Sequence, residues 1–175
     1  QPLSAREPYW SALDRYVWTY RLQNHEWRGH APLREMIEAL WAARGERYGA
    51  PPAASIPKLR AEFGRRWDID TALTYLALIN WMGAWDDDIH NYLLWRQANG
   101  RWSMAPWDYD DLWARSDFPI DGGPLNYFKQ GLIAAYGPEY LERLWVLNNT
   151  LLHPANVAAV ANAGEEAAAF AEKRQ

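Results

Sequence analysis

The dipeptide Asn99-Gly100 constrains the fold of this chain more than any other feature, because it lies between two apolar runs. An Asn-Gly pair in this setting is the strongest short-range signal for a β-hairpin with a two-residue turn. With that turn, Leu94 is expected to face Ala105 and Tyr92 to face Trp107. Both faces of such a hairpin would be apolar, which predicts that it is buried in the protein and does not lie on its surface.

The rest of the chain has mainly helical periodicity. A chain of 175 residues is long enough for one domain with its own core and too short for two. We expect a short strand near residues 16–21 and a loop over 49–57. Helices are expected over residues 33–45, 58–66, 72–81, 125–136, 138–152 and 155–173, and residues 68–71 offer a cap for the helix over 72–81. The predicted fold is α+β, mainly α-helical, in a single domain over residues 1–175 with a central hairpin at about 91–108.

Composition excludes several classes of function. A net charge of −4 gives no basic surface for nucleic acid, so no nucleic-acid partner is expected. The absence of cysteine excludes disulfides, thiolate metal sites and cysteine nucleophiles. No apolar run is long enough to span a membrane. Because the chain begins with Gln1 and shows no signal segment, we expect it to be excised from something longer or processed.

Twelve tryptophans are far more than ordinary usage. One interpretation is a sugar-binding surface on which indole rings stack. The other is that tryptophan and tyrosine fill a small helical core and its crevices. Because most of the tryptophans lie at helical or strand periodicity, we favour the core.

The hairpin is expected to gather oxygen ligands at its open end. With the predicted register, Asn91 lies opposite Asp108, and directly paired residues have Cβ atoms about 5 Å apart. Asp110 would project the same way if the strand continued, although Pro106 could introduce a bulge that shifts the register by one. One amide and one or two carboxylates suit Mg²⁺, which takes few protein ligands and adds waters and phosphates.

Asp86 precedes Asn91 by five residues. The same spacing occurs in the catalytic loop of protein kinases, where the Asp orients the substrate hydroxyl and the Asn holds magnesium. A hairpin and a second metal-binding Asp follow in those enzymes, as Asp108 does here. The alternative is that residues 86–88 form a solvated acidic loop and Asn91 is a turn residue.

The segment from Trp67 to Asp110 resembles the core of the CotH kinase family, which is named for a spore-coat protein. Members typically show an apolar helix, an Asp-x4-Asn with His before the Asn, an aromatic-rich strand and Pro-Trp-Asp-x-Asp. The corresponding residues here are Asp86, His90-Asn91-Tyr92, Leu94-Trp95-Arg96 and Pro106-Trp107-Asp108-Tyr109-Asp110. Close agreement covers only about a quarter of the chain.

The resemblance implies a protein-kinase-like C-terminal lobe in which Asp86 is the catalytic Asp. Asn91 and Asp108 would bind the cofactor and its metal, assisted by Asp110, and Asp87 would replace Asp86 if the loop bulges. It further implies Mg²⁺ or Mn²⁺, ATP as co-substrate and a protein substrate with a Ser or Thr hydroxyl. By the same resemblance the protein would be bacterial, and extracellular or in the cell envelope or spore coat.

One departure from the kinase pattern limits this expectation. The glycine-rich loop and the strand lysine of an ATP-covering lobe are not found before Asp86. We therefore expect the chain to represent the C-terminal lobe alone, with little or no activity by itself. Two other functions stay open: a glycoside hydrolase or carbohydrate-binding module with paired carboxylates, and a non-catalytic coat or envelope domain.

Overall fold

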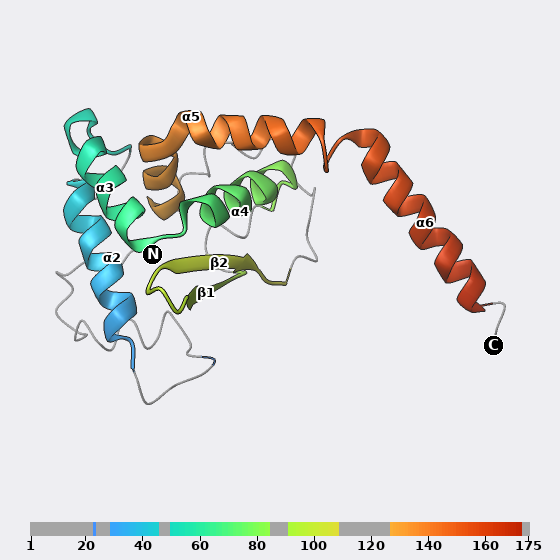
Figure 1. Cartoon of the computed structure of the whole chain (residues 1–175), viewed down its shortest axis with the longest axis horizontal. Coiled ribbons are helices and arrows are strands. Elements are labelled where there is room, and N and C mark those ends of the chain that lie inside the picture. The colour runs from blue at the N-terminus through green and yellow to red at the C-terminus, as the bar shows by residue number, and fades with distance from the viewer. Residues whose placement is uncertain (1–22, 24–28, 46–49, 85–90, 109–126, 173–175) are drawn as a thin grey trace.

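The computed structural model describes residues 23, 29–45, 50–84, 91–108 and 127–172 (Figure 1). Within these ranges it is mainly helical, with one two-stranded antiparallel sheet, as the sequence predicts. The predicted strand at residues 16–21 lies outside the described residues. In chain order, the elements are α2 (Ala31–Arg44), η2 (Ala53–Ser55), α3 (Ile56–Arg66), α4 (Ile69–Trp81), β1 (Tyr92–Arg96), β2 (Trp102–Pro106), α5 (Tyr127–Asn149) and α6 (Pro154–Glu172).

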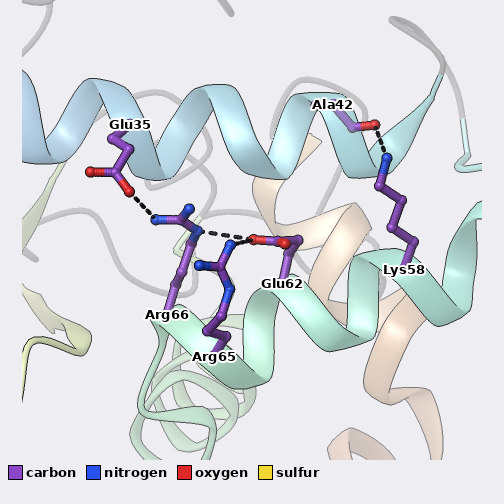
Figure 2. A network of polar contacts seen from close by, with 6 residues as sticks. All are labelled: Glu35, Ala42, Lys58, Glu62, Arg65 and Arg66. Carbon is purple, nitrogen blue, oxygen red and sulfur yellow. Dashed lines mark hydrogen bonds and ion pairs between the residues drawn. The ribbon is translucent and has the colours of Figure 1, made fainter.

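Helices α2 and α3 pack against each other, and the ion pair between Arg66 and Glu35 and the hydrogen bond from Lys58 to the Ala42 carbonyl oxygen join them (Figure 2). Arg66 lies between two carboxylates, with Nε 3.0 Å from Glu62 Oε2 and Nη1 3.1 Å from Glu35 Oε1. Burial raises the pKa of Glu62, but the hydrogen bonds from Arg66 and Arg65 lower it by more. The pKa of this carboxyl therefore lies below its ordinary value, and the charged form contributes to the packing of α3 on α2.

Helix α4 is the centre of the core, as its almost uniformly apolar sequence predicts. In Figure 1 it lies between α5 and the hairpin, and it makes its main contacts with these two elements. Seven of its residues are buried: Ala72, Leu73, Tyr75, Leu76, Ala77, Ile79 and Asn80. The helix begins after Asp68, whose Oδ1 accepts a hydrogen bond from the backbone N of Thr71 at 3.2 Å. The predicted N-cap is therefore confirmed.

Helix α5 contains the break that the sequence predicts between two helices. Tyr136 leaves helical geometry, with φ −134° and ψ 30°, two residues before Pro138. Proline lacks the amide hydrogen and its ring clashes with the carbonyl oxygen four residues earlier, which accounts for a kink in the turn before Pro138. Arg60 of α3 stabilises the kink, because its Nη1 donates to the Ala135 carbonyl oxygen at 2.6 Å and its guanidinium lies 4.1 Å from the Tyr136 ring centre.

The hairpin differs from the prediction by one residue in register. Leu94 pairs with Met104, and Leu93, in place of Leu94, pairs with Ala105. The cause is the turn, because the backbone N of Gly100 donates to the Gln97 carbonyl oxygen at 2.9 Å. Ala98 and Asn99 are thus the central residues of a turn, and Gly100 follows in the left-handed region with φ +83°. This is the three-residue loop that ends in a bulge, not the two-residue loop that was expected.

One face of the hairpin is buried and the other only in part, because Ser103 on that second face is 0% exposed while its tryptophans are exposed, so the prediction of two buried faces holds only in part. Met104 is buried and Leu94 packs against the same core, on the side of α4. On the other side Trp95 is 42% exposed and Trp107 is 61% exposed. The expectation that tryptophans fill the core holds for Trp67, which is 1% exposed, but not for these two residues.

Helix α6 extends away from the other described elements (Figure 1). Its alanine-rich sequence predicts a helix, and the structure confirms it over Pro154–Glu172. The side chains described in its first part, from residue 154 to 164, are all exposed. None of the helices within the described ranges is both long enough and apolar enough to cross a membrane.

A substitution pair separates the contributions of the two carboxylates that flank Arg66. We expect Glu62→Gln to lower the free energy of unfolding at pH 7 by ~1–2 kcal/mol, because the Glu62 side chain is only 22% exposed and receives charged hydrogen bonds. The matched Glu35→Gln should cost less than about 0.5 kcal/mol, since this side chain is 72% exposed and solvent screens the pair. Urea unfolding of both variants measures the difference, and equal losses would contradict this account.

Candidate active site

Asn91 and Asp108 lie beside one another at the open end of the hairpin. Asn91 Nδ2 donates to the backbone carbonyl oxygen of Asp108 at 3.2 Å. The backbone N of Trp107 donates to the backbone carbonyl oxygen of Asn91 at 3.1 Å. The last pair of the ladder is Tyr92 with Pro106, and the next hydrogen bond joins Asn91 to Trp107, so Asp108 is not the direct partner of Asn91 that was expected. The two candidate ligands are nevertheless adjacent, as the hairpin argument predicts, while their role as ligands stays a prediction.

Both residues have an unusual backbone conformation. Asn91 has φ +66° and Asp108 has φ +58°, and no other non-glycine residue in the described ranges has a positive φ. Asn and Asp tolerate this left-handed region better than other residues with side chains. Residues held in such conformations cluster at functional sites, where the neighbouring structure maintains them. The two strands therefore end in a matched pair of sharp backbone bends.

The donor set at this end suits a hard cation. Because Asn91 Nδ2 donates to Asp108, the atom of this amide that could bind a metal is Oδ1. Asp108 is exposed and supplies carboxylate oxygens. Two protein oxygens fit Mg²⁺ or Mn²⁺, with waters and phosphate oxygens completing the coordination. They do not fit a closed structural zinc site, which needs four ligands, usually sulfur or nitrogen.

The other predicted site residues lie outside the described residues. The structure does not place Asp86, its alternative Asp87 or Asp110. Within the described ranges, no group of three or more acidic or histidine side chains gathers that could hold a metal by itself. The described part of the candidate site is therefore the Asn91–Asp108 pair.

A second polar cluster holds the opposite end of the hairpin and was not anticipated from the sequence. We call the hydrogen bonds among Asp68, Gln97 and Ser103 the Asp68 clamp. Gln97 Nε2 donates to Asp68 Oδ2 at 2.9 Å and to Ser103 Oγ at 2.6 Å. The backbone N of Asp68 donates to the Trp102 oxygen at 2.9 Å, which joins the start of α4 to β2. The same carboxylate thus caps α4 and fixes the hairpin against it.

The clamp lies in the protein interior at its β2 end. Ser103 is 0% exposed, so its hydroxyl depends on protein partners for its hydrogen bonds. The hydrogen bond from Gln97 lowers the pKa of Asp68 and outweighs the opposing effect of burial, and the hydrogen bond from Thr71 lowers it further. Asp68 is therefore held in its charged form. A glutamine directly after the strand was the available sequence signal, and it does not by itself identify a partner.

The two roles of Asp68 can be separated by substitution. Asp68→Asn keeps an oxygen for the Thr71 cap but loses the charged acceptor for Gln97, and we expect it to cost about 1 kcal/mol. Asp68→Ala removes both and should cost roughly 1 kcal/mol more. Urea unfolding at pH 7 measures both losses. Equal losses in the two variants would contradict a separate contribution from the clamp.

The same carboxyl predicts a dependence on pH. Because folding lowers the pKa of Asp68, its contribution is complete above the ordinary value of about 4 and is lost as the pH falls through the lowered value. The difference in unfolding free energy between wild type and Asp68→Asn should therefore shrink below about pH 4. A difference that stays constant from pH 7 to pH 3 would show that the charge on Asp68 is not involved.

Comparison with known proteins agrees with the motif. The model of the CotH kinase protein family matches residues 7–152. Inner spore coat protein H of Bacillus subtilis (strain 168) is 36% identical over 64 residues, a match that covers 35% of this chain and 18% of that relative. No solved structure matches the chain significantly. Because the family model spans most of the sequence, the chain belongs to the CotH kinase protein family.

Proposed function

We propose that this chain is the metal-binding and catalytic part of a protein kinase that transfers the γ-phosphoryl group of ATP to a Ser or Thr hydroxyl of a protein. The observation that carries the proposal is the contact between Asn91 and Asp108 at the end of the hairpin. These are the two positions at which a kinase-like site needs an amide and a carboxylate. Membership of the CotH kinase protein family supports the same activity.

In this proposal each residue has a separate role. Asp86 accepts the proton of the substrate hydroxyl. The hydroxyl oxygen bonds to the γ-phosphorus as the bond between this phosphorus and the ADP oxygen breaks. Asn91 Oδ1 and the Asp108 carboxylate bind the cation, and Asp110 is a possible additional ligand. Mg²⁺ or Mn²⁺ supplies positive charge to the phosphate oxygens on which negative charge develops. The Nδ2 hydrogen bond to Asp108 orients Asn91 so that Oδ1 is the ligand atom.

A non-catalytic role in a spore coat is the second candidate. The relative that matches this chain is named as an inner spore coat protein, which favours a location in the coat. The match covers 18% of that relative, so the activity and partners of the whole protein are inferred, not observed, for this chain. A coat protein without catalysis needs no metal at Asn91 and Asp108, and metal binding therefore separates the two candidates.

Metal binding can be measured directly with Mn²⁺ by electron paramagnetic resonance on the full-length protein. We expect Asn91→Ala and Asp108→Ala each to weaken Mn²⁺ binding about tenfold or more, equivalent to ~1.4 kcal/mol or more, because each removes one of few protein ligands. Asp70→Ala is the matched control, since this carboxylate is 74% exposed and pairs with Arg143. Wild-type Mn²⁺ affinity in both site variants would favour the non-catalytic candidate.

Catalysis is tested by transfer of radiolabelled phosphate from ATP to protein by the full-length enzyme. Asp86→Ala should reduce incorporation by about 10²-fold or more, because a positioned acid–base group contributes that much or more to proton transfer. Asp87→Ala, its neighbour in the acidic run, is the control and should retain most of the activity. A normal rate for Asp86→Ala with a large loss for Asp87→Ala would move the catalytic role to Asp87.

A further inference from the structure

The turn of the hairpin contains a chemical reactivity that the proposed kinase does not use. When Gly follows Asn, the Gly backbone nitrogen can attack the Asn side-chain carbon Cγ, because glycine has no side chain in the way. A bond forms between that nitrogen and Cγ, the bond to the amide nitrogen breaks, and ammonia leaves with the proton from the Gly nitrogen. Water then opens the cyclic imide to Asp or to isoaspartate. In this turn Asn99 is exposed to water and Gly100 is half-buried.

The folded turn holds both reacting groups in other interactions. The nucleophile, the backbone N of Gly100, donates its hydrogen to the Gln97 carbonyl oxygen at 2.9 Å. The electrophile, the Asn99 side-chain amide, is held at both atoms. Its Oδ1 accepts from the backbone N of Arg101 at 2.9 Å, and its Nδ2 donates to Gln97 Oε1 at 3.0 Å. The turn must therefore open before the nitrogen can reach Cγ.

The same contacts connect Asn99 to the Asp68 clamp. Gln97 Oε1 accepts from Asn99, and this leaves Gln97 Nε2 to donate to Asp68 and Ser103. Replacing the Asn99 amide with a carboxylate removes the donor and places negative oxygen against Gln97 Oε1. An isoaspartate additionally lengthens the backbone by one carbon. This is expected to disrupt the hydrogen bond from the Gly100 N to the Gln97 carbonyl oxygen that closes the turn.

We propose that Asn99-Gly100 is a spontaneous deamidation site, that the closed turn protects it, and that its conversion weakens the hold of Gln97 on Asp68. The hairpin that carries Asn91 and Asp108 would then be attached to α4 less tightly at the turn end. Because the ammonia that leaves does not return, the converted residue stays in the chain, and converted protein accumulates each time an opening of the turn leads to reaction. This inference does not depend on the kinase activity.

Protection is tested by incubating the protein at neutral pH, folded or unfolded in urea, and measuring Asn99 conversion by mass spectrometry of the peptide that contains it. We expect conversion in the folded protein to be at least ~10-fold slower, because only the locally opened fraction reacts. Equal rates in the folded and unfolded chain would overturn the proposal.

The role of the clamp is tested by substitution. Gln97→Ala should raise the rate in the folded protein several-fold and leave the rate in urea unchanged. Arg60→Ala is the control, because the contacts that it loses join α3 to α5 and involve none of the hydrogen bonds of the turn or the clamp. Equal acceleration in the two variants, or none in Gln97→Ala, would show that the clamp does not protect Asn99.

The consequence of conversion is tested with Asn99→Asp, which has the side chain of one product. Hydrogen exchange at the backbone N of Asp68, which donates to Trp102 in the wild type, should become several-fold faster. Exchange within α2 should be unaffected. Unchanged exchange at Asp68 would overturn the proposed link between deamidation and the clamp.

Discussion

The Asp68 carboxylate joins the start of the central helix α4 to the turn end of the hairpin. One of its oxygens caps α4 through Thr71, and the other accepts from Gln97, which also binds the buried Ser103 hydroxyl. A charge-assisted hydrogen bond is stronger than a neutral one, and its acceptor here is held in the charged form. The orientation of the hairpin relative to the core, and hence the position of its open end, depends on this group.

The two ends of the hairpin differ in structure: the turn end is attached to α4, and the open end carries the backbone bends at Asn91 and Asp108. At the turn end, the clamp and the bridge between Trp67 and Trp102 attach it to the start of α4. At the open end, Pro106 cannot donate to the ladder, and the backbone bends at Asn91 and Asp108. This arrangement suits a site that must accept a metal ion and a nucleotide from solution.

Much of the fold could be predicted from the sequence, because helix periodicity and capping are local properties. The α4 cap, the end of α2 near Gly45 and the break near Pro138 were all predicted in this way. The hairpin was predicted, but its register was not, since a two-residue and a three-residue loop around Asn-Gly differ only in which backbone groups bond. The clamp could not be predicted, because Gln97 and Asp68 are 29 residues apart and meet only through tertiary packing. The adjacency of Asn91 and Asp108 could be predicted because the hairpin forces it, whereas the position of Asp86 lies outside the described residues.

The central claim, that Asn91 and Asp108 share one cation, is tested most directly by paramagnetic broadening in NMR spectra of the full-length protein. Mn²⁺ bound with a non-hydrolysable ATP analogue should broaden the side-chain amide signal of Asn91 and the backbone amide of Asp108. The side-chain amide of Asn99 should broaden much less, because five residues of strand put it about 17 Å further away. Broadening at Asn99 with sharp signals at Asn91 and Asp108 would contradict the claim.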